Sequence, residues 1–373
     1  MRDHSQVHRI VVKVGTNLLS SRDGIDEECV DAISAQIATL NKRGYQVLLV
    51  SSGAIGLGAK ELRLTGTVKQ VKLRQACASI GQPLLMSSWR RSFKKHGLLC
   101  SQLLLTRRDL NNRLTYVNLR NSVSTLLELG VVPIFNENDT VSTAEIGTAF
   151  GDNDRMSAMV ASKIDAELLI ILTDIDGLYT ADPRKNGSAR LLGEVKVLDD
   201  EVLSYAGGAG STHATGGMKT KLLAAKIAAV AGCGTIIVSG YEKDALLRLL
   251  DGEVLGTYIH PAKRLSQRQR WILNNSHLGS IEIDRGAKEA ILRRKSLLPS
   301  GVVKVNGVFS EGDVVQVYAS GEKPFAKAAV YLNATEIATV AGHPSADVAP
   351  LLGSGHKAMI FRPEDVVLLD DGQ

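Results

Sequence analysis

The sequence predicts an α/β protein with an open, largely parallel sheet sandwiched by helices, followed by a small, mostly β C-terminal domain. Short apolar runs alternate with helical patterns over roughly the first 260 residues, which is typical of a parallel sheet with helices on both faces. These runs are rich in Val, Ile and Leu at successive positions, as expected for strands buried on both faces. After about residue 276 the pattern changes to strand-like alternation with closely spaced Gly turns, which indicates the second domain.

The elements of the first region are predicted from its apolar runs and from the signals that end helices. The predicted strands are His8–Val14, Gln46–Ser51, Leu98–Leu105, Val131–Phe135, Leu168–Thr173 and Thr235–Ser239. The predicted helices are Asp26–Arg43, Val68–His96, which we expect to be broken within its length, and Arg113–Leu129. Two of these helices are followed by Gly44 and Gly130, and glycine is favoured there because it adopts a left-handed backbone without steric penalty.

Length and charge predict how the chain is divided. A chain of 373 residues is long for one domain, so we predict a first domain over 1–260, a basic linker over 261–278 and a second domain over 279–373. The linker has four Lys or Arg and no Asp or Glu, whereas the second domain has ten basic and twelve acidic residues. No apolar run is long enough for a membrane span or a signal peptide, so we expect a cytoplasmic protein.

A cluster of carboxylates and amides follows the fourth predicted strand. Asn136 and Asp139 come directly after this strand, and Asp152, Asn153 and Asp154 stand where the next helix should begin. Polar groups gathered at the carboxyl end of a buried strand commonly bind a ligand in open α/β sheets. A pair of helix N-caps joined by a solvated loop is the alternative, but two such clusters flanking one loop favour a site.

Lysines, glycines and hydroxyls follow three other predicted elements. Lys13 lies at the end of the first strand, where an unpaired charge would be costly. The segment SSGAIGLG from Ser51 allows backbone N–H groups to approach an anion. The segment ATGGMKTK, from Ala214 to Lys221, opens a helix and could cradle phosphates, although a Gly-rich turn with solvated lysines is the alternative. There is no Gly-Lys dipeptide, so the Walker A motif is excluded.

Together these features predict phosphoryl transfer from ATP to a small metabolite with an amino group. The lysines and glycines would hold phosphates, and the carboxylates and amides would hold the acceptor. No His or Cys general base stands out, and none is needed if the acceptor is a carboxylate, which is ionised at neutral pH. No pattern predicts a metal held by protein ligands alone, so we expect Mg²⁺ to be bound mainly through ATP.

These segments also match ordered blocks of a known family. The sequence resembles the glutamate 5-kinases of the amino acid kinase family, which carry a C-terminal PUA domain. The resemblance covers nearly the whole chain and rests on the blocks VVKVGTN, SSGAIGLG, PIFNENDTV, FGDNDRMSA, LTDIDGLYTADP and ATGGMKTK. It implies that 1–260 is the catalytic domain and 279–373 a PUA-like domain. It also implies that ATP phosphorylates the γ-carboxylate of L-glutamate, the first step of proline biosynthesis.

The resemblance implies roles for individual residues. Lys13 and Lys221 would stabilise the transferring phosphoryl group from opposite sides, with Asp154 orienting both lysines. The implied glutamate-binding residues are Ser52, Asp139 and Asn153, supported by Asn136 and Asp152. The implied ATP contacts are Lys13, Thr173, Asp174, Thr215, Gly216, Gly217, Met218, Lys219, Thr220 and Lys221.

The resemblance further implies regulation and assembly. Family members are commonly inhibited by proline, tend to form homo-oligomers, and produce a labile acyl phosphate that could pass directly to glutamyl phosphate reductase. The loop between Asp139 and Asp152 varies in length within the family and borders the glutamate and proline site. Here Gly147–Phe150 lengthens this loop relative to the shortest forms, so we expect it to influence affinity and feedback sensitivity.

Two other functions fit parts of the sequence. A kinase of the same fold could act on N-acetylglutamate, aspartate, carbamate or UMP, but an N-acetylated substrate lacks the cationic amine that Asp139 would bind. The PUA-like domain, with the basic Lys263–Arg270 segment, could instead bind RNA. The second domain carries more acidic than basic residues, which favours a role in assembly or regulation over RNA binding.

Overall fold

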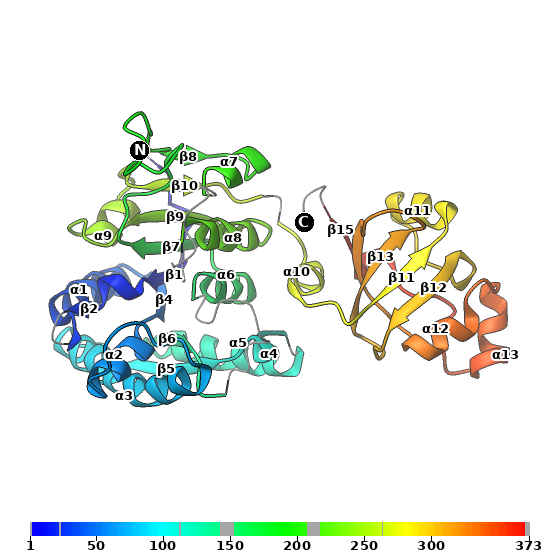
Figure 1. Ribbon diagram of the computed structural model, residues 1–373, viewed down its shortest axis with the longest axis horizontal. Coiled ribbons are helices and arrows are strands. Elements are labelled where there is room, and N and C mark those ends of the chain that lie inside the picture. Colours follow the sequence, from blue (N-terminus) through cyan, green and yellow to red (C-terminus); the bar gives the residue numbers. More distant parts are fainter. Residues whose placement is uncertain are drawn as a thin grey trace. The chain divides into compact units, whose positions relative to one another are not determined.

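The computed structural model describes residues 2–21, 24–111, 113–141, 153–206, 217–262 and 264–369. Its internal contacts divide the chain into two compact units, Met1–Arg264 and Leu265–Gln373 (Figure 1). The boundaries expected from the sequence, at residues 260 and 279, stay a prediction. No helix among the described residues is long and apolar enough to cross a membrane.

The first unit is built on one sheet that contains eight strands in the part of the chain that the structure describes. Their order is β5-β6-β4-β1-β7-β9-β10-β8. The strands are β1 (Arg9–Val14), β4 (Gln46–Ser51), β5 (Cys100–Leu105), β6 (Val132–Glu137), β7 (Leu168–Thr173), β8 (Glu194–Val195), β9 (Gly234–Ser239) and β10 (Thr257–Ile259). All neighbouring pairs are parallel except β9 and β10, so the predicted largely parallel sheet is confirmed.

Helices cover both faces of this sheet (Figure 1). Alternate residues of a strand pack against different helices. The even-numbered residues of β1, such as Ile10 and Val12, share a core with α1 (Glu27–Lys42), α3 (Val71–Lys95) and α9 (Ala245–Leu250). Val11 shares the opposite core with α5 (Arg113–Glu128), α6 (Asn153–Lys163) and α8 (Met218–Ala229). Lys13 lies two residues after Val11, and the period of two therefore places it on the α6 and α8 face.

The prediction of a broken helix over 68–96 is wrong. α3 is continuous from Val71 to Lys95, although Pro83 lies inside it. It packs closely against α2 (Ala54–Glu61), because a Cβ atom at Gly81 would lie 1.8 Å from the Ala54 carbonyl oxygen. This close packing offsets the backbone hydrogen bond that a proline removes. The end of β6 also differs from the prediction, since Asn136 and Glu137 belong to the strand instead of following it.

Short elements complete the first unit. They are β2 (Ser20–Ser21), β3 (Gly24–Ile25), α4 (Arg107–Asn111) and α7 (Asp200–Ser204).

The second unit contains a five-stranded sheet in the order β12-β11-β13-β14-β15, as far as the structure describes it. The strands are β11 (Gly279–Ile283), β12 (Val302–Gly307), β13 (Val314–Ala319), β14 (Ala326–Ala329) and β15 (Val366–Leu368), and the helices are α10 (Gln267–Asn274), α11 (Arg285–Leu292), α12 (Ala334–Val340) and α13 (Val348–Leu352). The prediction of a mostly β domain is confirmed. α10 falls within the expected linker, yet its Ile272 is buried against Val314 and Val367 of this sheet.

Candidate active site

Polar side chains gather where four neighbouring parallel strands of the first unit end. β6, β4, β1 and β7 lie side by side, so their carboxyl ends share one edge of the sheet. Asn136, Ser52, Lys13 and Thr173 stand at or next to these ends, and each is buried. Asn153 and Asp154 begin α6 and link the two halves of the site described below.

The first half, which we call the cationic half, consists of Lys13, Asp154 and Lys221. One carboxylate oxygen of Asp154, Oδ1, lies 2.7 Å from Lys13 Nζ, and the other, Oδ2, lies 3.4 Å from Lys221 Nζ. Asp154 is 1% exposed, and both lysines are buried. The structure therefore brings together the three residues for which the sequence predicted catalytic roles.

In the cationic half, burial and the pairing of opposite charges shift the pKa values of Asp154 and Lys221 in opposite directions. Burial alone would raise the pKa of Asp154, but Lys13 and Lys221 outweigh it and hold that pKa below its ordinary value. Burial lowers the pKa of Lys221, and the repulsion from Lys13 adds to this effect, while Asp154 opposes it. Within the cationic half, two buried ammonium groups thus share one carboxylate, which favours an anionic ligand, and Asp174 adds negative charge near Lys221.

The first turn of α8 supports this half. Gly217 is the N-cap of α8 and makes no side-chain cap hydrogen bond, so the N-terminus of this helix is suited to an anionic ligand. Thr220 Oγ1 donates to Asp154 Oδ2 at 2.8 Å. Met218 is half-buried and Lys219 is exposed. Thr215 and Gly216, which were also predicted to contact ATP, lie outside the described residues.

Thr173 and Asp174 lie at the end of β7, beside the cationic half. Thr173 is buried and donates from Oγ1 to Asp174 Oδ1 at 3.1 Å. Asn17 Nδ2 donates to Asp174 Oδ2 at 2.7 Å. Burial tends to raise the pKa of Asp174, but these hydrogen bonds, led by that from Asn17, hold it below its ordinary value.

The second half, which we call the amide half, consists of Ser52, Asn136, Asp139 and Asn153. Asn153 Nδ2 donates to Ser52 Oγ at 2.9 Å and to Asn136 Oδ1 at 3.1 Å. Asn153 Oδ1 is buried and has no hydrogen-bond partner among the described residues. Asp152, predicted to support this half, lies outside the described residues, as does the loop over 142–152.

Asp139 is the carboxylate of the amide half. It is 7% exposed, and its Oδ1 has no hydrogen-bond partner in the described part of the chain. Burial, with repulsion from Glu137, raises the pKa of Asp139 to about 6, although Arg74 opposes the shift. The amide half therefore offers unsatisfied acceptor atoms, which suit a ligand that donates hydrogen bonds and carries positive charge.

Sequence reasoning missed two residues of these networks. Asn17 is the last residue of the VVKVGTN block and was given no role, although its amide follows a strand end closely; in the structure it donates to Asp174. Gln82 accepts from Asn136 Nδ2 at 2.7 Å, across 54 residues of sequence. It lies in the middle of α3, and no local motif distinguishes it from an ordinary helical residue.

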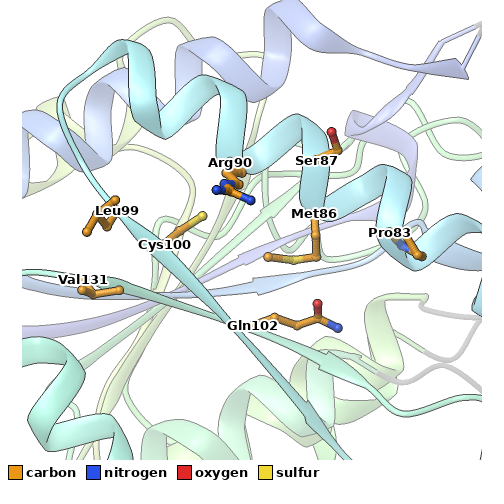
Figure 2. Close-up of a pocket in the computed structure, with 8 residues that line it drawn as sticks. All are labelled: Pro83, Met86, Ser87, Arg90, Leu99, Cys100, Gln102 and Val131. Atoms are coloured by element: carbon orange, nitrogen blue, oxygen red, sulfur yellow. The ribbon is translucent and has the colours of Figure 1, made fainter.

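A separate groove lies beside α3 and the edge strand β5. Its volume is about 590 Å³, and its walls contain Pro83, Met86, Ser87, Arg90, Leu99, Cys100, Gln102 and Val131 (Figure 2). None of the predicted site residues lines it. The groove is therefore distinct from the two halves described above.

Family profiles identify the class of protein that this fold and site define. The profile of the amino acid kinase family matches residues 8–239, and the profile of the PUA domain matches residues 279–352. The first match spans the strand ends and helices that build both halves of the site. The chain belongs to the amino acid kinase family.

Curated relatives place the chain more narrowly within that family. The glutamate 5-kinase of Methanosarcina mazei is 42% identical over 374 residues, covering 98% of this chain and 97% of the relative. The glutamate 5-kinase of Methanococcoides burtonii is 44% identical over 367 residues, covering 96% of each chain. The chain therefore groups with the glutamate 5-kinases, as its motifs predicted.

Solved structures support the same fold at greater distance. Carbamate kinase from Giardia lamblia bound to AMP-PNP aligns with a TM-score of 0.50 at 18% identity, covering 69% of this chain and 99% of that chain. At this identity the similarity shows the shared fold of the first unit and nothing about the substrate.

Proposed function

We propose that this protein phosphorylates the γ-carboxylate of L-glutamate with ATP, yielding L-glutamyl 5-phosphate and ADP. The observation that carries the proposal is the pair of buried lysines around Asp154, next to an amide half with unsatisfied acceptors. Relatives named glutamate 5-kinase, aligned over nearly their whole length, support glutamate as the acceptor.

The cationic half would hold the phosphates of ATP. Lys13 and Lys221 would approach the γ-phosphate from two sides, and Asp154 would fix the directions of both ammonium groups. Thr173, Asp174 and the first turn of α8, which has Gly217 as its N-cap, would make further contacts with ATP. Stabilisation of this kind is strongest on the charge that develops in the transition state.

The amide half would hold glutamate. Asp139 and the Oδ1 atom of Asn153 would accept hydrogen bonds from the substrate ammonium group. Ser52 would donate a hydrogen bond from its hydroxyl group to the substrate. Asn136 and Asp152 would support these residues. The γ-carboxylate has a reference pKa of about 4.3 and is ionised at neutral pH, so it can attack the γ-phosphorus without a general base.

We expect Mg²⁺ to enter with ATP. No group of three or more His, Cys, Asp or Glu among the described residues could hold a metal. Both oxygens of Asp154 already have partners, which leaves the phosphates as the main ligands. A Mg²⁺ ion bound in this way would neutralise part of the charge that repels the attacking carboxylate.

Similarity to the glutamate 5-kinases supports a proposal for the wider setting of the reaction. We propose that it is the first step of proline biosynthesis in the cytoplasm, that proline inhibits it, and that the product passes to glutamyl phosphate reductase. We also propose a homo-oligomer. β5 is an edge strand, and Leu99 at the rim of the groove in Figure 2 is 71% exposed, which supports an assembly contact there.

Trapping the acyl phosphate tests the proposed function. The purified full chain is incubated with ATP, Mg²⁺ and hydroxylamine, which displaces phosphate from the product to form a hydroxamate. We expect hydroxamate and ADP to form with L-glutamate, and to form more slowly when proline is added. Hydroxamate from aspartate but not from glutamate would assign the protein to another substrate.

A further inference from the structure

Gln82 connects α3 to the amide half. It is 8% exposed, and it is the middle residue of a Gly-Gln-Pro triplet inside a continuous helix. Gly81 has no room for a Cβ atom, because one would lie 1.8 Å from the Ala54 carbonyl oxygen, and Pro83 lines the separate groove. Gln82 is therefore the residue of the triplet that reaches the polar network.

The direction of the hydrogen bonds in this network is set by a backbone group. The Glu137 N–H donates to Asn136 Oδ1 at 2.9 Å, and a backbone N–H can only donate. Oδ1 of Asn136 is therefore its oxygen, and its Nδ2 must find an acceptor elsewhere. Gln82 Oε1 is that acceptor, at 2.7 Å.

The same direction determines what Asn153 offers to a ligand. Asn136 Oδ1 at 3.1 Å and the Ser51 carbonyl oxygen at 3.3 Å are both acceptors, so Asn153 turns its Nδ2 toward them. Asn153 Oδ1 is then left without a partner among the described residues. If Asn136 lost the Gln82 acceptor, its buried Nδ2 would be unsatisfied, and rotation to satisfy it would bring an N–H group against Asn153 Nδ2, which the Ser51 carbonyl also holds, and so displace Asn153.

α3 supports the other part of the amide half as well. Ser79, one helical turn before Gln82, has its Oγ 3.0 Å from Thr140 Oγ1, and Thr140 directly follows Asp139. α3 therefore contacts the amide half at Asn136, through Gln82, and beside Asp139, through Ser79. Such support for side chains that contact a ligand commonly controls how well they are aligned.

We infer that Gln82 is a positioning residue for the substrate: it fixes Asn136, which in turn makes Asn153 present its oxygen to the substrate ammonium group. The inference rests on the proposed function for the identity of the substrate. It predicts an effect on glutamate and not on ATP, since the cationic half does not use this network.

Three variants test the inference by steady-state kinetics with varied glutamate and varied ATP. Gln82→Met keeps the shape and removes the acceptor, so we expect KM for glutamate to rise about tenfold while KM for ATP is unchanged. Gln82→Glu keeps an acceptor oxygen in either protonation state, so its KM for glutamate should be close to that of the wild type. Gln36→Met is the matched control, because Gln36 is also 8% exposed and its Oε1 accepts from Leu246 N at 2.9 Å, away from the site.

The outcomes separate positioning from simple stability. The thermal unfolding temperature should fall at least as much in Gln36→Met as in Gln82→Met, because Gln36 Nε2 also donates to the Ala32 carbonyl at 3.2 Å whereas Gln82 Nε2 has no partner among the described residues. KM for glutamate should rise in Gln82→Met alone. The inference would be overturned if Gln82→Met left KM for glutamate unchanged, if it raised both KM values equally, or if Gln82→Glu were as impaired as Gln82→Met.

A double-mutant cycle tests whether Gln82 acts through Asn136. In an Asn136→Ala background, Gln82→Met should change KM for glutamate by no more than about twofold, since the shared interaction is already lost. A full tenfold effect in that background would contradict the inference. A wild-type chain that forms no glutamyl hydroxamate would instead contradict the proposed function, so the two failures are distinguishable.

Discussion

Each half of the site contains a buried aspartate, and the pKa of this aspartate is shifted in opposite directions in the two halves. Asp154 in the cationic half is 1% exposed, contacts two lysines and Thr220, and has a pKa below its ordinary value. Asp139 in the amide half is 7% exposed, has one oxygen without a hydrogen-bond partner among the described residues, and has a pKa of about 6.

The difference shows that the effect of burying a carboxylate depends on the groups around it. Lys13 and Lys221 keep the buried Asp154 ionised in the folded protein, whereas Arg74 offsets the burial of Asp139 only in part, so ionised Asp139 destabilises the fold until a ligand supplies further positive charge. The cationic half is therefore held together before ATP binds. Among the described residues, Asn153 Oδ1 and Asp139 Oδ1 of the amide half have no hydrogen-bond partner, and the proposed substrate would satisfy them, which would favour binding at the expense of stability in the free protein.

The largest effect is expected from removing a lysine of the cationic half. Lys221→Ala should lower kcat by about 10²- to 10³-fold, because the lost charge acts mainly on the transition state. Lys226→Ala, in the last turn of the same helix, is the control and should leave kcat within about twofold. If Lys221→Ala changed only KM for glutamate, the proposal that the cationic half acts on ATP and the amide half on glutamate would be contradicted.

Replacing Asp154 tests whether the cationic half stabilises the fold. Asp154→Asn should lower the free energy of unfolding by about 3 kcal/mol at pH 7, because two buried ammonium groups lose their shared anion. The pKa of Asp154 is lowered in the folded state, so its stabilisation is complete at neutral pH and is lost as the pH falls below the ordinary Asp value of about 3.9. Chemical unfolding at pH 7 and at pH 3 measures both parts of this prediction. An unchanged midpoint at pH 7 would show that the lysines do not depend on Asp154.

The pH dependence of glutamate binding should reveal Asp139. With a pKa of about 6, Asp139 is ionised at pH 8 and mostly protonated at pH 5, where it no longer attracts an ammonium group. We expect KM for glutamate to rise about tenfold between these pH values, with a smaller change in KM for ATP. The rise should be absent in Asp139→Asn. If that variant keeps the same pH dependence, another group is responsible for it.

The smallest effect is expected from the hydroxyl that supports Asp154. Thr220→Val keeps the side-chain shape but removes the donor to Asp154 Oδ2, so kcat should fall by about fivefold. Glutamate KM should be unchanged, because Thr220 contacts only the cationic half. A larger change in KM for glutamate than in kcat would show that the halves are coupled through Asp154.

Much of the fold could be predicted because its strands are continuous apolar runs. Strands buried on both faces need such runs, and β4 and β7 have the predicted ends. The helix over 68–96 was mispredicted because its local signal, Pro83, indicates a break, while close packing at Gly81 keeps the helix continuous. Tertiary contacts of this kind are not encoded in local propensity.

The candidate site was predictable to the extent that its residues stand next to strand ends or belong to family motifs. Lys13 and Asn136 could be found in this way. Gln82 could not, because its contact with Asn136 depends on how α3 crosses the sheet. Asp152, Thr215 and Gly216 lie outside the described residues, and their roles stay predictions.

The stability of Asp139→Asn tests most directly the claim that the amide half is destabilising until the substrate binds. The pKa of Asp139 is raised, so the wild-type protein loses stability as the pH rises from about 4 to above 6, and the neutral variant does not. Because one pKa unit corresponds to about 1.4 kcal/mol, we expect the variant to be more stable by about 3 kcal/mol at pH 8, to lose this advantage at pH 4, and to bind glutamate at least about tenfold more weakly. A variant that is less stable than the wild type at pH 8, or that binds glutamate normally, would contradict the account.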